Sequence, residues 1–212
     1  MSRLEQVIGR QFGRPRGLLG WFVARLMRRS NAGLNLWIVD LLQIEPHDRV
    51  LEVGFGPGVA LDQLVASASA GFVAGVDASG LMVRQAHSRH AAAIAAGRLE
   101  LRQGDAGALP YTDATFDKAC GTHVIYFWPD PVSTVRELRR VLRPGGRLAL
   151  GYQEREHMPP RARAGLSQAG ANLLGPGEVE QVVRAAGFED VRVEEQVAPD
   201  GPAGFCVLAI KS

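Results

Sequence analysis

Short apolar runs alternate along this chain with longer segments in which apolar residues recur at the spacing of a helix face. Such runs predict buried strands, and the longer segments predict amphipathic helices. The predicted strands cover residues 49–53, 72–76, 99–103, 116–121, 147–152, 191–196 and 205–211, and the predicted helices cover 31–42, 59–68, 81–96, 132–142 and 178–186. Strands that alternate with helices are typical of a doubly wound parallel sheet.

Two segments depart from this alternation. Strands 191–196 and 205–211 follow one another without a helix, so we expect them to close the sheet as an antiparallel pair. Residues 153–177 are polar, contain proline and are too long for a simple connection, which predicts a lid or a substrate-shaping insert. The predicted fold class is therefore α/β, with a doubly wound, mostly parallel seven-stranded sheet, helices on both faces and an antiparallel terminal strand. We divide the chain into an N-terminal helical arm or cover, 1–44, and a main domain, 45–212.

Length and composition indicate an ordinary globular protein, with 212 residues of which 46% are hydrophobic and 22% charged. No apolar run has the length of a membrane span. The apolar stretch 17–27 is short, carries Arg25 and lacks a small-residue cleavage site, so we expect no secretory signal and a cytoplasmic protein. Cys120 and Cys206 each lie in a strand-like run, which predicts small buried hydrophobes rather than a metal site or a disulfide.

Charge is spread unevenly, although the net charge is only +2. Seven arginines accompany a single acid, Glu5, within residues 1–30. A basic arm with apolar residues can contact anionic lipid or a phosphorylated substrate. Arginine exceeds lysine throughout the chain, however, which favours the simpler interpretation of a solvated arm. No basic patch with interleaved aromatic residues follows, so we expect no nucleic-acid partner.

The segment from Val50 to Gly58 is the most informative stretch. A short apolar run contains Glu52 and leads into glycines at positions 54, 56 and 58, which predicts a buried strand turning tightly into a helix around a ligand. Glycine leaves the backbone bare for a nucleotide-like ligand and permits a positive φ angle. The spacing is G-x-G-x-G rather than the G-x-G-x-x-G of dinucleotide binders, which disfavours NAD. The alternative is a glycine-rich turn that binds nothing.

This segment resembles motif I of the class I S-adenosylmethionine (SAM) methyltransferases, in which an acidic residue at the position of Glu52 helps to hold the methionine end of the cofactor. Asp77 resembles the family's acidic residue that accepts hydrogen bonds from both ribose hydroxyls, with a helix N-cap as its alternative role. Met82 lies where this family often places an apolar side chain against adenine, and a core role stays open. Asp105 and Ala106 resemble the motif that recognises the adenine amine and ring.

Two further stretches extend the resemblance. Residues 116–117 open the fourth strand as the family's motif IV does, and 142–148 resemble the tight turn before the fifth strand, whose role is architectural. The resemblance covers residues 45–152 and is closest to the small-molecule branch that includes ubiquinone and menaquinone methyltransferases. It implies SAM as cofactor and S-adenosylhomocysteine as product. The cofactor-binding residues that it implies are Glu52, Gly54, Gly56, Gly58, Asp77, Ala78, Met82, Asp105, Ala106 and Gly121.

Methyl transfer from a sulfonium is an in-line displacement, in which the protein mainly aligns and desolvates the acceptor. A base is needed only where the acceptor must lose a proton. His123 follows the fourth strand, where the carboxyl edge of the sheet meets the cofactor, and it is the predicted catalytic base; the alternative is a histidine that only packs. Tyr126, Phe127 and Trp128 line an apolar acceptor pocket in one interpretation and the core in the other. The residues near this strand end offer no cluster of magnesium ligands, so no metal is predicted.

The sequence therefore predicts a SAM-dependent methyltransferase that acts on a small apolar or aromatic acceptor. Two alternatives stay open: a peripheral enzyme that methylates phospholipid head groups at a membrane surface, and a SAM-binding protein without transferase activity. We also expect the helix from Asn31 to Leu42 and the insert 153–177 to form a cover over the cofactor, to which Trp21, Phe22 and Trp37 supply apolar surface. The acceptor atom and the oligomeric state are not predicted.

Overall fold

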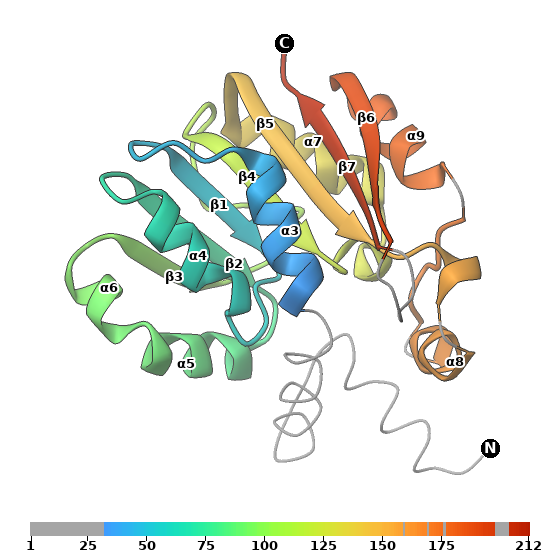
Figure 1. Ribbon diagram of the computed structural model, residues 1–212, viewed down its shortest axis with the longest axis horizontal. Helices are drawn as coiled ribbons and strands as arrows, with labels where there is room; N and C mark the ends of the chain where they lie inside the picture. Colours follow the sequence, from blue (N-terminus) through green and yellow to red (C-terminus); the bar gives the residue numbers. More distant parts are fainter. Residues whose placement is uncertain (1–31, 159, 169, 176, 198–203) are drawn as a thin grey trace.

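The computed structural model describes residues 32–158, 160–168, 170–175, 177–197 and 204–212. These residues build one seven-stranded sheet with the strand order β3-β2-β1-β4-β5-β7-β6 (Figure 1). The strands are β1 (Arg49–Val53), β2 (Phe72–Asp77), β3 (Leu99–Gln103), β4 (Phe116–Thr122), β5 (Leu142–Tyr152), β6 (Glu189–Gln196) and β7 (Gly204–Ile210). Strand β7 runs antiparallel to both β5 and β6, and the remaining pairs are parallel. The predicted fold class is confirmed.

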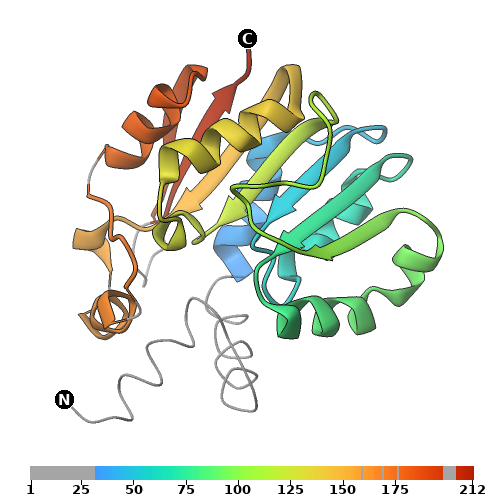
Figure 2. The same ribbon diagram turned by 180° about the vertical axis from the view of Figure 1, so that it is seen from behind.

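Helices cover both faces of the sheet, as the two opposite views show (Figures 1 and 2). Helices α3 (Ala32–Leu42), α4 (Val59–Ser67) and α5 (Gly80–Arg89) share one apolar core with the sheet, and α7 (Pro131–Val141) and α9 (Glu178–Ala185) share a second core. Successive residues of β1 enter different cores, Val50 the first and Leu51 the second. A central parallel strand that is buried on both faces is mostly apolar, and β1 follows this pattern apart from Arg49 and Glu52.

Helix α3 packs on the sheet as a core element. Its Ile38 and Leu42 are fully buried, and the helix lies against β4, β5 and β7. A Cβ atom on Gly151 of β5 would overlap the Ile38 side chain, so this glycine lets the helix lie close to the strand. The last helix of the predicted arm 1–44 is therefore packed into the main domain. Residues 1–31 lie outside the described residues, and their role as a cover stays a prediction.

The predicted helix 81–96 is two helices in the structure, α5 and α6 (Ala91–Ala95). The break falls at His90, whose backbone leaves the helical region. The His90 side chain is buried, and its Nδ1 lies 3.3 Å from an Oδ1 oxygen of Asp62 on α4. This tertiary contact outweighs the local helical pattern, which continues through the break in the sequence.

The structure also corrects the predicted tight turn at 142–148. Strand β5 already begins at Leu142. Leu142 pairs with Phe116 and Arg147 pairs with Lys118, so the residues between them bulge out of the β4–β5 ladder. Gly145 adopts φ +77° within this bulge, and its N–H donates to the Lys211 carbonyl at 2.6 Å. The segment is therefore a bulged strand start that is bonded to the residue after β7, rather than a free turn, and its architectural role stays a prediction.

The predicted insert leaves β5 at its carboxyl end. It contains a short 3-10 helix, η2 (Arg155–His157), and the helix α8 (Pro160–Gln168). Both views show α8 beyond the carboxyl end of β5, on the side toward which the parallel strands point (Figures 1 and 2). In doubly wound sheets ligands bind at this edge, so the insert lies near the expected site. No helix among the described residues is long and apolar enough to cross a membrane.

Candidate functional site

The glycine loop between β1 and α4 has the predicted left-handed backbone. Gly54, Gly56 and Gly58 have φ angles of +67°, +51° and +74°. A Cβ atom on Gly54 would overlap Val124, and one on Gly58 would lie 3.0 Å from His90 Nε2, so these two glycines are required by packing as well. At Gly56 no described atom lies within 4 Å of an added Cβ, which makes this residue the open point of the loop.

Asp77 at the end of β2 holds this loop in place. Its side chain is 8% exposed, and its two oxygens each accept a backbone N–H at 2.8 Å, Oδ2 from Gly56 and Oδ1 from Ser79. Burial raises the pKa of Asp77, and the two hydrogen bonds oppose that rise. Ser79, not Asp77, occupies the N-cap position of α5. Since a carboxylate oxygen accepts more than one hydrogen bond, Asp77 retains capacity for hydroxyl donors of a ligand.

Glu52 is a carboxyl group in the centre of the sheet. It lies in β1 between Gly75 of β2 and Cys120 of β4, and it is 5% exposed. Its Oε2 has no hydrogen-bond partner among the described residues. Burial, with a smaller contribution from the charge of Asp77, raises the pKa of Glu52 to about 8. A buried acceptor without a partner is costly, and an ammonium or N–H donor from a ligand would satisfy it.

The loop after β3 reaches the same edge of the sheet. The N–H of Gly104 donates to the Asp77 carbonyl at 3.0 Å, which joins this loop to the end of β2. Asp105 is exposed, and its Oδ1 accepts the N–H of Gly107 at 2.9 Å. Ala106 is half-buried beside it. The structure thus brings together the predicted positions for the methionine, ribose and adenine ends of a nucleoside cofactor.

Three other predicted cofactor residues have different surroundings. Met82 is 2% exposed and belongs to the core with α4 and α5, which supports the core alternative. A Cβ atom on Gly121 would lie about 3 Å from Val53 and Val124, so packing between β1 and β4 accounts for this glycine. Ala78 is exposed between β2 and α5.

His123 follows β4 in a conformation that the sequence did not reveal. Its φ is +57°, a left-handed value that is uncommon for histidine, and its N–H donates to the Gly151 carbonyl at 2.8 Å. The ring stacks on Tyr126 with 6.0 Å between centroids, and Nδ1 lies 3.4 Å from the Tyr126 hydroxyl. Burial lowers the pKa of His123 to about 4. The imidazole is therefore neutral at pH 7 and has a lone pair for a proton.

The aromatic residues after His123 belong to the 3-10 helix η1 (Ile125–Phe127) and its flank. Tyr126 and Trp128 are buried in the core with α7 and α9, and Phe127 packs against that core. The core interpretation therefore holds for Tyr126 and Trp128. Tyr126 also has a polar role that we did not predict, because its hydroxyl donates to the Gln153 carbonyl at 2.9 Å and accepts the Gln153 N–H.

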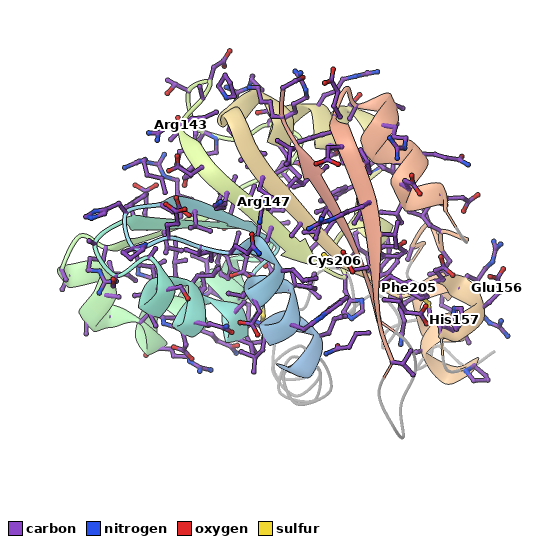
Figure 3. The ribbon with its side chains drawn as sticks, turned by 45° about the horizontal axis from the view of Figure 1, so that its top comes forward. Arg143, Arg147, Glu156, His157, Phe205 and Cys206 are labelled. Atoms are coloured by element: carbon purple, nitrogen blue, oxygen red, sulfur yellow. The ribbon has the colours of Figure 1, made fainter. Side chains whose placement is uncertain are left out.

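A second polar group at this edge was also missed. Glu154 is buried at the start of the insert, and its Oε2 lies 3.4 Å from Nδ1 of His157. The His157 ring lies 5.3 Å from the ring of Phe205 on β7, which pairs with Tyr152 at the end of β5, and Figure 3 shows the two side chains near one another. Glu154 stands in a polar stretch without periodicity, so only the fold shows that it is buried.

Comparison with known proteins gives a consistent family likeness. A family model for the methyltransferase domain matches residues 51–150. YdaC of Bacillus subtilis, an uncharacterized methyltransferase, is 29% identical over 187 residues, which cover 88% of this chain and 96% of YdaC. The ubiquinone/menaquinone biosynthesis C-methyltransferase UbiE of Geotalea daltonii is 32% identical over 113 residues, which cover 53% of this chain and 48% of UbiE. The chain thus spans nearly all of the first relative and about half of the second.

A solved structure supports the same fold. It is a Haloferax volcanii complex between the Trm112 methyltransferase activator and a methyltransferase, with a TM-score of 0.74 and 19% identity. The match covers 88% of this chain and 92% of the chain in that structure. At this identity the likeness concerns the fold alone.

Proposed function

We propose that this chain, which is similar to the class I SAM-dependent methyltransferases, methylates a small apolar or aromatic acceptor at the carboxyl edge of its sheet. SAM, when bound, supplies an electrophilic methyl group and a neutral thioether leaving group. The observation that carries the proposal is the buried Glu52, whose Oε2 has no partner among the described residues, together with the open position at Gly56; Asp77 interacts with both. A ligand that brings a cationic amine to this point satisfies Glu52 and meets no side chain at the loop.

We assign the cofactor contacts to the residues at this edge. Glu52 accepts from the amino group of the methionine end, and Asp77 uses its remaining lone pairs for the ribose hydroxyls. Asp105 and Ala106 face the adenine, with Asp105 accepting from the exocyclic amine. The hydrogen bonds of Asp77 to the loop support this assignment, because they fix the carboxylate before a ligand arrives.

His123 is the proposed base for an acceptor that must lose a proton. With SAM held by Glu52 and Asp77, the methyl group would pass to the acceptor oxygen or carbon, the electron pair of the carbon–sulfur bond would stay on sulfur, and His123 would take the acceptor proton. A neutral ring is required for this role, and His123 is neutral at pH 7; the burial that lowers its pKa to about 4 also makes it a weaker base than an exposed histidine. The likeness to UbiE supports an aromatic, quinol-type acceptor.

The test compares acceptor classes with SAM as the methyl donor. The purified chain is incubated with a hydroquinone, with an aliphatic amine and with vesicles that contain phosphatidylethanolamine, and S-adenosylhomocysteine is quantified. We expect product with the hydroquinone. His123→Asn, chosen because asparagine tolerates a left-handed backbone, should slow turnover by about 10²–10⁴-fold with little change in SAM affinity. His87→Asn on the exposed side of α5 is the matched control.

Each outcome separates the alternatives. Turnover only with the vesicles would replace the proposal by phospholipid head-group methylation. Binding of SAM without product from any acceptor class would favour a non-catalytic SAM-binding protein. Full turnover by His123→Asn would remove the base role from His123 and leave the cofactor assignment intact.

A further inference from the structure

Tyr126 is the residue through which the strand end at His123 and the insert are joined. Its hydroxyl donates to the Gln153 carbonyl at 2.9 Å and accepts the N–H of the same residue. Its own carbonyl accepts the N–H of Asn172 at 2.8 Å. Gln153 begins the insert and Asn172 lies near its end, so one tyrosine binds both ends of the segment.

The hydroxyl of Tyr126 also limits how His123 can be protonated. A phenol has one hydrogen to donate, and here it goes to the Gln153 carbonyl. The same oxygen can therefore act only as an acceptor toward the Nδ1 of His123, which lies 3.4 Å away. A neutral imidazole carries one hydrogen, so a hydrogen on Nδ1 leaves Nε2 with the free lone pair.

We propose that Tyr126 is a positioning residue of the acceptor site, which holds the proton of His123 on Nδ1, leaves Nε2 as the proton acceptor, and fastens both ends of the insert beside it. This inference rests on the proposed role of His123 as base. The contact from Nδ1 to the phenol orients the ring, as a second partner commonly does for a functional histidine. The other tyrosine of this core, Tyr152 on β5, is buried, and its hydroxyl has no hydrogen-bond partner in the described parts of the chain.

The difference between the two tyrosines provides a matched pair of variants. Tyr126→Phe and Tyr152→Phe each remove one buried hydroxyl and keep the ring. Long-range proton–nitrogen NMR of the nitrogen-15-labelled chain reports which ring nitrogen of each histidine carries the hydrogen. The chain has five histidines, and a His123→Asn variant identifies the His123 signals by their loss.

We expect the unsubstituted protein to carry the His123 hydrogen on Nδ1 at neutral pH. In Tyr126→Phe the acceptor for that hydrogen is gone, and the ring should move to a mixture of tautomers. Amide exchange of Gln153 should become about ten-fold faster, because its N–H loses its partner, whereas exchange at Asn172 should change less, since its bond is to the main chain. Tyr152→Phe should leave the tautomer and both amides unchanged.

An Nε2–H tautomer in the unsubstituted protein would overturn the inference without any variant. Equal effects of the two tyrosine variants would also overturn it, because burial rather than the particular contact would then be responsible. Activity tests a different statement: full turnover by His123→Asn together with the expected NMR result would refute the base role and leave the positioning contact standing.

Discussion

Glu52 in β1 is buried and His123 after β4 is half-buried, and removal from water moves their pKa values in opposite directions. The pKa of Glu52 rises to about 8 and that of His123 falls to about 4. In both cases removal from water disfavours the charged form. The site without ligand therefore presents an uncharged acid and an uncharged base at pH 7, and a cationic ligand would favour ionisation of Glu52.

Replacement of Glu52 by glutamine should change how stability depends on pH. The folded pKa lies above the ordinary value of 4.5, so between pH 4.5 and about 8 the unfolded chain loses a proton that the folded chain keeps. The contribution of Glu52 to stability is thus fully present below pH 4.5 and is lost as pH rises toward 8. Urea unfolding of Glu52→Gln should show less loss of unfolding free energy over this range than the parent. A difference that is constant with pH would contradict the assigned burial.

Replacement of Asp77 by alanine should weaken SAM binding by roughly 1.5–3 kcal/mol, measured by calorimetry. The variant removes a charged acceptor from the ligand, and it also frees the N–H of Gly56 from the carboxylate. Asp113→Ala is the control, because that side chain is 78% exposed and pairs with Arg140 instead. Undiminished affinity in Asp77→Ala would count against the ribose assignment.

The conformation and role of a site residue could be predicted where a single short segment contains the whole sequence motif. Glu52 and the three glycines lie in one short motif, so the sequence indicated both the turn and its left-handed backbone. The contact of Tyr126 with Gln153 joins residues 27 positions apart, and no local sequence pattern indicates it. The left-handed backbone of His123 is likewise held by a bond to Gly151, on the neighbouring strand.

At the scale of elements, substitutions in the glycine loop can distinguish two effects of an added side chain. One is steric exclusion of the ligand, and the other is strain in the backbone. Gly56→Val should abolish SAM binding and cost about 1–3 kcal/mol of stability, because valine is strained at a positive φ and its side chain fills the open point. Gly97→Val is the control: Gly97 has φ +69° and no described atom within 4 Å of an added Cβ, but it follows α6 away from the site. The Gly97→Val variant should be less stable than the parent and should bind SAM with unchanged affinity. A folded Gly56→Val variant that binds SAM normally would show that the loop is only a turn and does not bind the ligand.

Elements were predictable where apolar periodicity and burial coincide. Strands β1 and β3 have the predicted bounds: β1 is mostly apolar and buried, and in β3 the buried Leu99 and Leu101 alternate with more exposed polar residues. The break at His90 and the bulge at Gly145 were missed for a common reason. Each depends on a partner from elsewhere in the chain, Asp62 for the first and Lys211 for the second, and tertiary contacts override local propensity.

For the whole molecule, deletion of residues 1–30 tests the cover hypothesis. Helix α3 keeps its buried residues in such a truncation, and the proposed cofactor contacts all lie after residue 50. We therefore expect a folded protein with nearly unchanged SAM affinity and reduced turnover, with faster amide exchange in the insert 153–177. Full turnover by the truncated chain on its acceptor, with unchanged exchange in the insert, would refute a cover role.

The position of β7 has a consequence for synthesis of the protein. This strand follows all the others in the chain, yet it lies between β5 and β6 in the sheet. During synthesis β6 is made before β7, with which it pairs among the described residues, and the outer edge of β5 stays open until Gly204–Ile210 has joined the sheet. An open edge next to an apolar core is a template for pairing with other chains. A chain truncated before residue 204 should therefore aggregate more than the full chain, which light scattering would measure.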